Sequence, residues 1–290
     1  MDTKLMPFDH FSDEDIRALT PAMKVGMMGT VTPEGLPHLT LITTLMASNA
    51  KTVVWGQFME GMSKKHVQQN PKVGFMIMSL AKDVWRGKAN YASIAKSGKD
   101  YDFYNNTPLF RYNAYFGVHS VHYMDLLAQS GKHPLPMNQI IPAAIKTMVV
   151  KALLPKKGKA QVLHAQVLSA WSKAFFDKID NLKFLGYVGA DGYPVIIPLI
   201  QAQSLDAEHM VFSFGAFGGE LEQIPAFTPV AVFGMALTME DVLVRGTYQG
   251  SKRVLGMKYG VVQLDYAYNP MPPKPAQIYP DVPLVAVREF

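Results

Sequence analysis

Ser63, Lys64 and Lys65 form a compact group of one hydroxyl and two ammonium side chains directly after an apolar segment. A lysine supplies a mobile positive charge, and a hydroxyl with neighbouring backbone N–H groups can complete a shell around an anionic oxygen. This combination suits a phosphate group. A solvated polar loop has the same composition, so the hypothesis depends on what the rest of the chain provides.

Two strands are expected to hold this basic group. Thr52 to Gln57 is apolar and β-branched, a polar loop with one helical turn follows, and Lys72 to Leu80 is strand-like again. Short strands are also predicted at Val25 to Val31, Pro37 to Leu45 and Asp83 to Ala92, after a short helix that begins at Ser12. Several short strands separated by Gly, Pro and Asn turns predict an antiparallel sheet or small barrel.

A sixth strand is predicted over Phe110 to Leu127. Alternation with period two places Ser120 and His122 on one of its faces and His119 on the other. The two histidines therefore cannot chelate one metal ion from a regular strand, and we expect no metal site. A single histidine as a haem ligand stays open.

The segment from Pro134 to Lys183 has a different character. Apolar residues from Ile140 to Val149 fall at helical spacing, and Val162 to Phe176 predicts a second amphipathic helix. We interpret this segment as a helical connector whose basic residues are solvated.

After the connector the first pattern returns. Gly29 to Pro37 corresponds to Gly186 to Pro194, Val53-Val54-Trp55 falls on Met210-Val211-Phe212, and Arg86-Gly87 matches Arg245-Gly246. In the last strand, Phe116-Gly117-Val118 matches Tyr259-Gly260-Val261. We therefore expect a first barrel with its leading helix over residues 1–130, a helical connector over 131–181, and a second, degenerate barrel with a proline-rich tail over 182–290.

The two copies differ at the basic group. Where the first has Ser63, Lys64 and Lys65, the second has Glu220, Leu221 and Glu222. Two carboxylates would repel a phosphate, so one chain is expected to offer one competent anion site. The barrel framework does not require the lysines, which favours a role in ligand binding.

The composition excludes several classes of protein. The 290 residues are 49% hydrophobic and 18% charged, and the net charge of +5 lacks the clustered basic face of a nucleic-acid binder. The absence of cysteine excludes disulfides and thiolate chemistry. The N-terminus does not resemble a signal peptide, and no apolar run is long enough to span a membrane. We expect a cytoplasmic protein without a membrane or nucleic-acid partner.

In their order and spacing, the motifs of the first copy resemble the pyridoxamine 5′-phosphate oxidase-like, FMN-binding split barrels. The resemblance covers Met23 to Ala92 well and the second copy more weakly. Its pieces are the strand-turn-strand Gly29 to His38, the segment Thr52 to Lys65, Asn70 to Val73, and Arg86-Gly87.

The resemblance implies a mainly β protein with a helical connector, built from two six-stranded antiparallel Greek-key split barrels in tandem. It also implies FMN as the cofactor, at the interface of a barrel pair that is either an intrachain pseudo-dimer or part of a homodimer. Carried over, Ser63, Lys64 and Lys65 would hold the flavin phosphate. The residues expected along the flavin or bordering its ring are Thr40, Leu41, Ile42, Thr43, Trp55, Gly56 and Gln57.

The family likeness predicts a flavin-dependent oxidoreductase acting on a small-molecule substrate, with no catalytic residue assigned. Two departures argue against pyridoxamine phosphate as that substrate. Leu39 to Thr44 is neutral where the true oxidases are arginine-rich, and their C-terminal Trp/Arg signature is missing. The alternatives are a non-catalytic flavin- or haem-binding protein that stores or senses its ligand, and a deazaflavin-dependent reductase.

Overall fold

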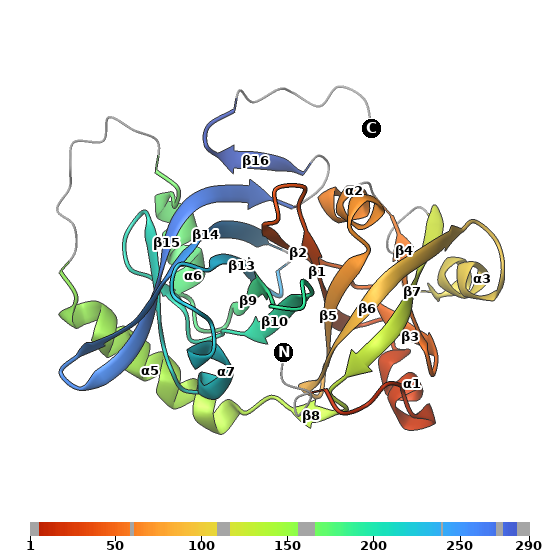
Figure 1. Ribbon diagram of the computed structural model, residues 1–290, viewed down its shortest axis with the longest axis horizontal. Coiled ribbons are helices and arrows are strands. Elements are labelled where there is room, and N and C mark those ends of the chain that lie inside the picture. The colour runs from red at the N-terminus through yellow and green to blue at the C-terminus, as the bar shows by residue number, and fades with distance from the viewer. Residues whose placement is uncertain are drawn as a thin grey trace. The chain divides into compact units, whose positions relative to one another are not determined.

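The computed structural model describes residues 6–58, 61–108, 117–155, 166–238, 240–270 and 275–282. These residues form two antiparallel sheets with a small number of helices, so the protein is mainly β, as predicted (Figure 1). The chain divides into two compact units. The first ends at Leu135 and also includes Val188–Ile196, and the second comprises Pro136–Tyr187 and the chain from Ile197 onward.

The first sheet closes on itself through one interrupted strand. Its strands are β1 (Lys24–Val31), β2 (Pro37–Leu41), β3 (Met46–Asn49), β4 (Thr52–Gln57), β5 (Lys72–Ser79), β6 (Asp83–Ala95), β7 (Ser120–Gln129) and β8 (His133–Pro134). They lie in the order β2-β1-β5-β6-β7-β4-β3, with β8 beside β6. Because β2 and β3 follow each other in the chain yet end opposite edges of this order, residues 37–49 join the two edges. Counted as one strand, they give the predicted six-stranded barrel with β8 added.

The second sheet repeats the first over seven of its eight strands. Its members are β9 (Leu182–Val188), β10 (Pro194–Pro198), β11 (Gln203–Ser204), β12 (His209–Ser213), β13 (Pro229–Met235), β14 (Asp241–Val254), β15 (Met257–Asn269) and β16 (Ala276–Tyr279). The order is β10-β9-β13-β14-β15-β12-β11, with β16 beside β15. The seven-strand order is identical to that of the first sheet, so the repeat found in the sequence is a repeat of the fold. The eighth strands differ, because β16 lies beside β15 whereas β8 lies beside β6, the equivalent of β14.

The repeat also includes the helix that leads into each barrel. Helix α1 (Asp13–Leu19) is capped by Ser12 and helix α6 (Ala170–Asp177) by Ser169, each through a side chain that accepts a backbone N–H. The spacing from Ser12 to Gly29 equals that from Ser169 to Gly186. Helix α6 therefore belongs to the second repeat. It begins at Ala170, later than the predicted start at Val162, because residues 166–169 are not helical; residues 162–165 lie outside the described residues.

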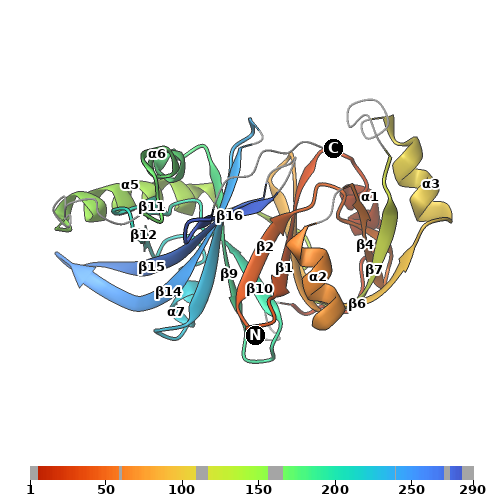
Figure 2. The same cartoon turned by 90° about the horizontal axis from the view of Figure 1, so that it is seen from above.

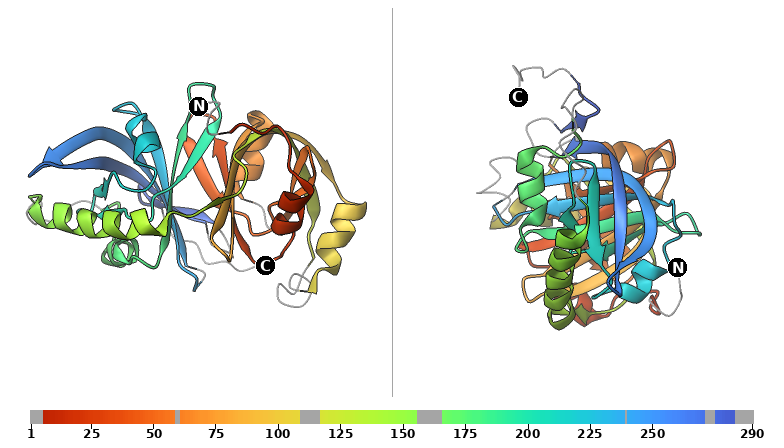
Figure 3. Two further views of the ribbon diagram at one scale, coloured as in Figure 1. Left: turned by 90° about the horizontal axis from the view of Figure 1, so that it is seen from below. Right: turned by 90° about the vertical axis from the view of Figure 1, so that its left-hand side faces the viewer.

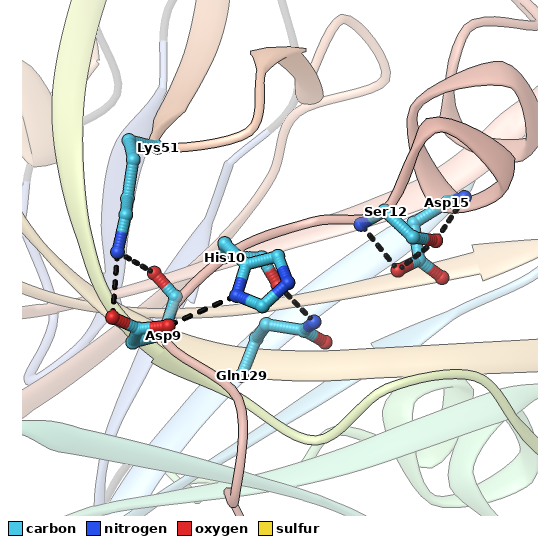
Figure 4. A network of polar contacts seen from close by, with 6 residues as sticks. All are labelled: Asp9, His10, Ser12, Asp15, Lys51 and Gln129. Carbon is cyan, nitrogen blue, oxygen red and sulfur yellow. Dashed lines mark hydrogen bonds and ion pairs between the residues drawn. The ribbon is translucent and has the colours of Figure 1, made fainter.

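Polar contacts fix the start of the chain to the first barrel (Figure 4). Lys51 Nζ donates to both the backbone oxygen and the carboxylate of Asp9, at 2.8 and 2.6 Å, and Gln129 Nε2 donates to the His10 backbone oxygen at 2.7 Å. In the capping box, the Asp15 carboxylate accepts the backbone N–H of Ser12. These contacts place α1 at one end of the barrel, where Leu19 joins its core.

Two more helices pack on the first barrel (Figure 2). Helix α2 (Met62–Gln69) lies over β1 and β2. Helix α3 (Lys99–Asn106) packs against β7, and its Tyr104 is buried against Val118 and Val121. No helix was predicted from the sequence at this position.

Strand β7 differs from the predicted Phe110 to Leu127 strand. It spans Ser120–Gln129, the preceding residues 117–119 are not in a strand, and 110–116 lie outside the described residues. The predicted alternation is confirmed within the strand, because Ser120 and His122 are hydrogen-bonded neighbours on one face.

Helix α5 (Met137–Leu153) follows the first repeat in the chain and packs on the second barrel (Figure 3). Val150 of α5 is buried against Val211, Tyr259 and Val261 of β12 and β15. The short helix α7 (Gly218–Glu222) stands where the first repeat has α2. None of the helices in the described ranges combines the length and apolarity needed to cross a membrane.

Two glycines of the first sheet lie against Pro194, which follows the turn after β9. Gly29 and Gly74 face each other across β1 and β5. A Cβ on Gly74 would lie 2.0 Å from the Pro194 backbone oxygen, and one on Gly29 would lie 2.9 Å from the Pro194 Cβ. The absence of side chains at both positions permits this close backbone approach. On the neighbouring strand, Lys88 pairs with Asp191 at 3.0 Å.

Candidate functional site

The basic group lies on a helix rather than on the predicted loop. Ser63, Lys64 and Lys65 all fall in the first half of α2, which Gly61 precedes as the N-cap. Residues 62–69 contain neither proline nor glycine, and Asn70-Pro71 ends the helical run. The first turn of α2 has no acidic residue, and no side chain caps it. No capping side chain therefore accepts a hydrogen bond from the first backbone N–H groups of the helix.

Ser63 faces inward from α2. Its side chain is buried, and its hydroxyl is hydrogen-bonded to the hydroxyl of Thr40 on β2. Either oxygen can be the donor, so the pair retains further hydrogen-bonding capacity. The structure thus brings together two predicted site residues that are far apart in the sequence.

The two lysines diverge because successive helical residues are about 100° apart. The buried face of α2 carries Ser63, His66 and Val67. Lys65 lies on the opposite side and is exposed, whereas Lys64 is half-buried. Burial raises the pKa of Tyr91 and lowers that of His122, and the charge of Lys64 makes a smaller, lowering contribution to both pKa values, which places it near these two side chains. Ser63 and Lys64 can therefore act on one ligand, and Lys65 points away from them.

His66 is a residue of this region that the sequence reading did not assign. It is buried under α2, its Nδ1 lies 3.0 Å from the Thr30 hydroxyl, and its ring meets His38 edge-on with 5.0 Å between centroids. Thr30 and His38 face each other across β1 and β2. Ser63 and His66 are three residues apart and therefore lie on one face of a helix. This spacing carries no information if the segment is interpreted as a loop.

Beneath Lys64 lies a buried polar network centred on His122. Its Nε2 donates to Gln57 Oε1 at 3.0 Å, and its Nδ1 accepts from the Tyr91 hydroxyl at 3.2 Å. Ser120 also donates to Gln57 Oε1, at 3.1 Å. Burial, with smaller contributions from Lys64 and His119, lowers the His122 pKa to about 4, so the imidazole is neutral at physiological pH. The Trp55 indole stacks on the His122 ring at 3.8 Å between centroids.

The predicted flavin-contacting residues divide into two groups. Thr40, Leu41, Ile42 and Thr43 are half-buried and remain accessible to a ligand. Trp55 and Gln57 are buried in the barrel interior, and a Cβ on Gly56 would meet Val118 on the other face. These β4 residues therefore lie in the interior and do not form part of the accessible surface made by Thr40 to Thr43.

The second barrel replaces the polar network with apolar packing. Trp55 faces His122 across β4 and β7, and Phe212 faces Gly260 across the equivalent strands β12 and β15. A Cβ on Gly260 would lie 2.4 Å from the Phe212 ring, so the phenyl group fills the space that the imidazole takes in the first barrel.

This pairing corrects the sequence match for the last strand. The match placed Gly260 on Gly117, but the observed register places it on His122, five residues later. The second barrel also has Glu220 in the first turn of α7, where the first barrel has basic side chains. The His122 network and the basic helix turn are therefore properties of the first copy.

Comparison with known proteins gives low similarity. No protein-family model matches the sequence, and no curated protein resembles it significantly. Among solved structures, HupZ of Group A Streptococcus has 14% identity and a TM-score of 0.34, over 41% of this chain and 91% of its own. An FMN-binding protein of Syntrophomonas wolfei has 15% identity and a TM-score of 0.34, over 40% and 82%. General Stress Protein 26 of Bacillus anthracis has 15% identity and a TM-score of 0.30, over 40% and 87%. At this level of similarity none of them assigns a ligand to this chain.

Proposed function

We propose that the first barrel binds FMN, with the phosphate at the N-terminal turn of α2, and that the protein is a flavin-dependent oxidoreductase. The observation that carries the proposal is the Thr40–Ser63 hydroxyl pair at this turn, next to a half-buried Lys64. The resemblance of the first repeat to FMN-binding split barrels supports the same ligand.

The chemistry of this donor set fits a phosphate monoester. Two hydroxyls and one ammonium can bind three oxygens, and the uncapped N–H groups of an eight-residue helix add donors and a favourable dipole. No acidic side chain lies in the first turn of α2 to oppose the anion. In α7, Glu220 would repel it, so one phosphate site per chain is proposed.

The rest of the flavin would lie along the half-buried residues Thr40 to Thr43. A bound flavin would supply hydride or electron transfer, and this chain would anchor it, orient it and exclude water. Because the buried His122 is neutral, the interior beneath the site contributes oriented dipoles without a second positive charge. Its bonds to Gln57 and Tyr91 fix the Trp55–His122 stack as a rigid support.

Absorption spectroscopy of the purified protein tests the cofactor. We expect a flavin spectrum, or reconstitution of one when FMN is added to the apoprotein. The phosphate predicts that FMN binds at least about tenfold more tightly than riboflavin, since each hydrogen bond to a charged group contributes about 1.5–3 kcal/mol. A Soret band would support a haem protein, a deazaflavin spectrum the third alternative, and equal affinity for FMN and riboflavin would refute the phosphate site.

The oxidoreductase part has its own test. Under anaerobic conditions, NADH or NADPH is added to the FMN-loaded protein and bleaching of the flavin absorbance is followed. Reduction faster than that of free FMN under the same conditions would support catalysis. Tight FMN binding without any acceleration by either donor would favour the storage or sensing role.

A further inference from the structure

A cleft in the second unit lies outside the proposed flavin site. It has a volume of about 390 Å³ and is formed by α6, the β13–β14 hairpin, the start of β14, the end of β15 and β16. Its lining residues are Trp171, Thr238, Glu240, Asp241, Val242, Asn269 and Ile278. One aromatic ring, one isoleucine and two carboxylates thus border the same space.

Asp241 is the unusual member of this lining. It is only 8% exposed, and among the described residues no donor lies within hydrogen-bond distance of its buried Oδ1. Buried carboxylate oxygens are normally paired, because an unpaired one loses its hydration without compensation. Burial, with no donor to offset it, raises the Asp241 pKa to about 7. A ligand that donates hydrogen bonds and carries positive charge would supply what this group lacks.

Trp171 provides a second feature suited to a cation. Its side chain is 50% exposed, and its ring is held by stacking on Phe175 at 5.2 Å between centroids. A half-exposed indole can bind an apolar group or attract a cation to its face. Glu240 adds a second carboxylate at the cleft, and the Thr238 hydroxyl donates to it at 3.0 Å.

The donor set favours an organic cation over a metal ion. In the described parts of the chain, no three His, Asp or Glu side chains gather closely enough to hold a metal. Two carboxylates beside an aromatic ring and an isoleucine instead match an ammonium group attached to an apolar body.

The acidic character of the cleft is not a requirement of the fold. In the first repeat, the corresponding helix α1 and the β5–β6 hairpin border a cleft of about 300 Å³ that contains Lys24 and apolar residues such as Leu19 and Ile77. There the buried Lys24 already donates to the Pro21 backbone oxygen at 2.7 Å. The cleft of the first repeat thus contains a buried cation that already has a partner, whereas the cleft of the second repeat contains a buried carboxylate oxygen without one in the part of the chain that the structure describes.

We propose that the cleft of the second unit binds a small organic cation, a primary ammonium compound with an apolar or aromatic body. The ammonium group would pair with Asp241 and Glu240, and the body would lie against Trp171 and Ile278. This site is independent of flavin binding in the first barrel.

The test uses benzylammonium and its uncharged counterpart benzyl alcohol as probes of the full-length protein, with dissociation constants from calorimetry or ligand-observed NMR. We expect benzylammonium to bind at least about tenfold more tightly than benzyl alcohol, because charge-assisted hydrogen bonds are the stronger kind. Binding should also tighten between about pH 6 and about pH 8, as Asp241 ionises while the amine stays protonated. Of the other titratable groups near Asp241, Glu240 borders the cleft, and Tyr268 stays neutral because its pKa is raised to about 12.

Asp241→Asn is the decisive variant. It keeps the shape of the side chain and should fold, since it removes an unpaired buried charge. We expect it to lose at least about tenfold in benzylammonium affinity, the preference over benzyl alcohol and the pH dependence. Asp265→Asn, at an exposed carboxylate of the same barrel outside the cleft, serves as the control and should bind as the wild type does. Equal binding of the two probes, no binding of benzylammonium at millimolar concentration, or full affinity in Asp241→Asn would each overturn the proposal.

Discussion

The Trp55 indole and the His122 imidazole stack face to face, with 3.8 Å between their centroids and 3° between their planes. They face each other across β4 and β7 in a hydrogen-bonded register. An imidazole held in this way, with hydrogen bonds to Gln57, Tyr91 and Ser120, is a neutral aromatic ring rather than an acid–base group. Because the ring is buried, protonation of His122 disfavours the folded barrel.

The stability of the first barrel should fall as the pH decreases through the titration range of His122. The unfolded chain binds this proton near pH 6.5 and the folded protein only near pH 4, so stability is full above about 6.5 and is lost between these values. The loss is on the order of 3 kcal/mol for two to three pKa units. Denaturant unfolding at several pH values measures it. His122→Gln should flatten this slope and His119→Gln, at an exposed histidine, should not; an unchanged slope in His122→Gln would contradict the assignment.

Asp241 should act in the opposite direction in the second unit. Its folded pKa of about 7 exceeds the unfolded value of 3.8, so its burial disfavours folding above pH 7 and the cost disappears as the pH falls toward 3.8. Asp241→Asn should therefore raise the stability by roughly 2 kcal/mol at pH 8 and much less at pH 4. Thermal unfolding without added ligand gives the comparison. A variant that is less stable than the wild type at pH 8 would show that the carboxylate has a partner in solution.

Gly74→Ala should destabilise the first unit strongly. The new Cβ would lie 2.0 Å from the Pro194 backbone oxygen, so the turn after β9 would have to move. Overpacking of this kind typically costs about 1–3 kcal/mol or more, and chemical denaturation can measure it. Gly219→Ala is the matched control, because nothing lies within 4 Å of its Cβ and its position in α7 favours alanine. Similar effects of the two substitutions would mean that the Gly74–Pro194 approach is not tight.

Lys64→Ala and Lys65→Ala should separate the two lysines of α2. Lys64 is half-buried near Tyr91, whereas Lys65 is exposed on the opposite side of the helix. We expect Lys64→Ala to weaken FMN binding by about tenfold or more and Lys65→Ala to change it less than about twofold. Titrations that follow flavin fluorescence provide both values. Riboflavin affinity should stay unchanged in each variant, and an equal loss of FMN affinity in both would place the phosphate elsewhere.

Most of the architecture was predictable from the sequence because the repeat preserves its spacing. Ser12 and Ser169, or Gly35 and Gly192 with the same positive φ, occupy equivalent positions in the two copies. Turn glycines and strand alternation are local signals, and their recurrence made the tandem barrels recognisable. The match failed in the last strand. There the β14–β15 connection is a tight turn after Val254, whereas a helix and a longer segment separate β6 from β7.

The candidate site was only partly predictable, since its geometry depends on tertiary contacts. The Ser-Lys-Lys group was visible in the sequence, but whether it lies in a loop or a helix decides which side chains converge. Ser63 meets Thr40 because α2 packs over β2, and Trp55 turns inward because His122 provides a stacking partner. Asp241 gave no sequence signal at all, because a missing hydrogen-bond partner becomes visible only when all neighbours are placed.

The residues Val188–Ile196 belong to the first compact unit although they lie within the second repeat. They bring Pro194 onto the glycine pair and Asp191 to Lys88. A gene shortened to end at Leu135 would therefore encode an incomplete domain, with a bare glycine surface and a lysine deprived of its carboxylate. The chain therefore cannot be divided into two complete domains at the boundary of the repeat. A recombinant protein that exchanges one repeat must keep residues 188–196 together with the first barrel.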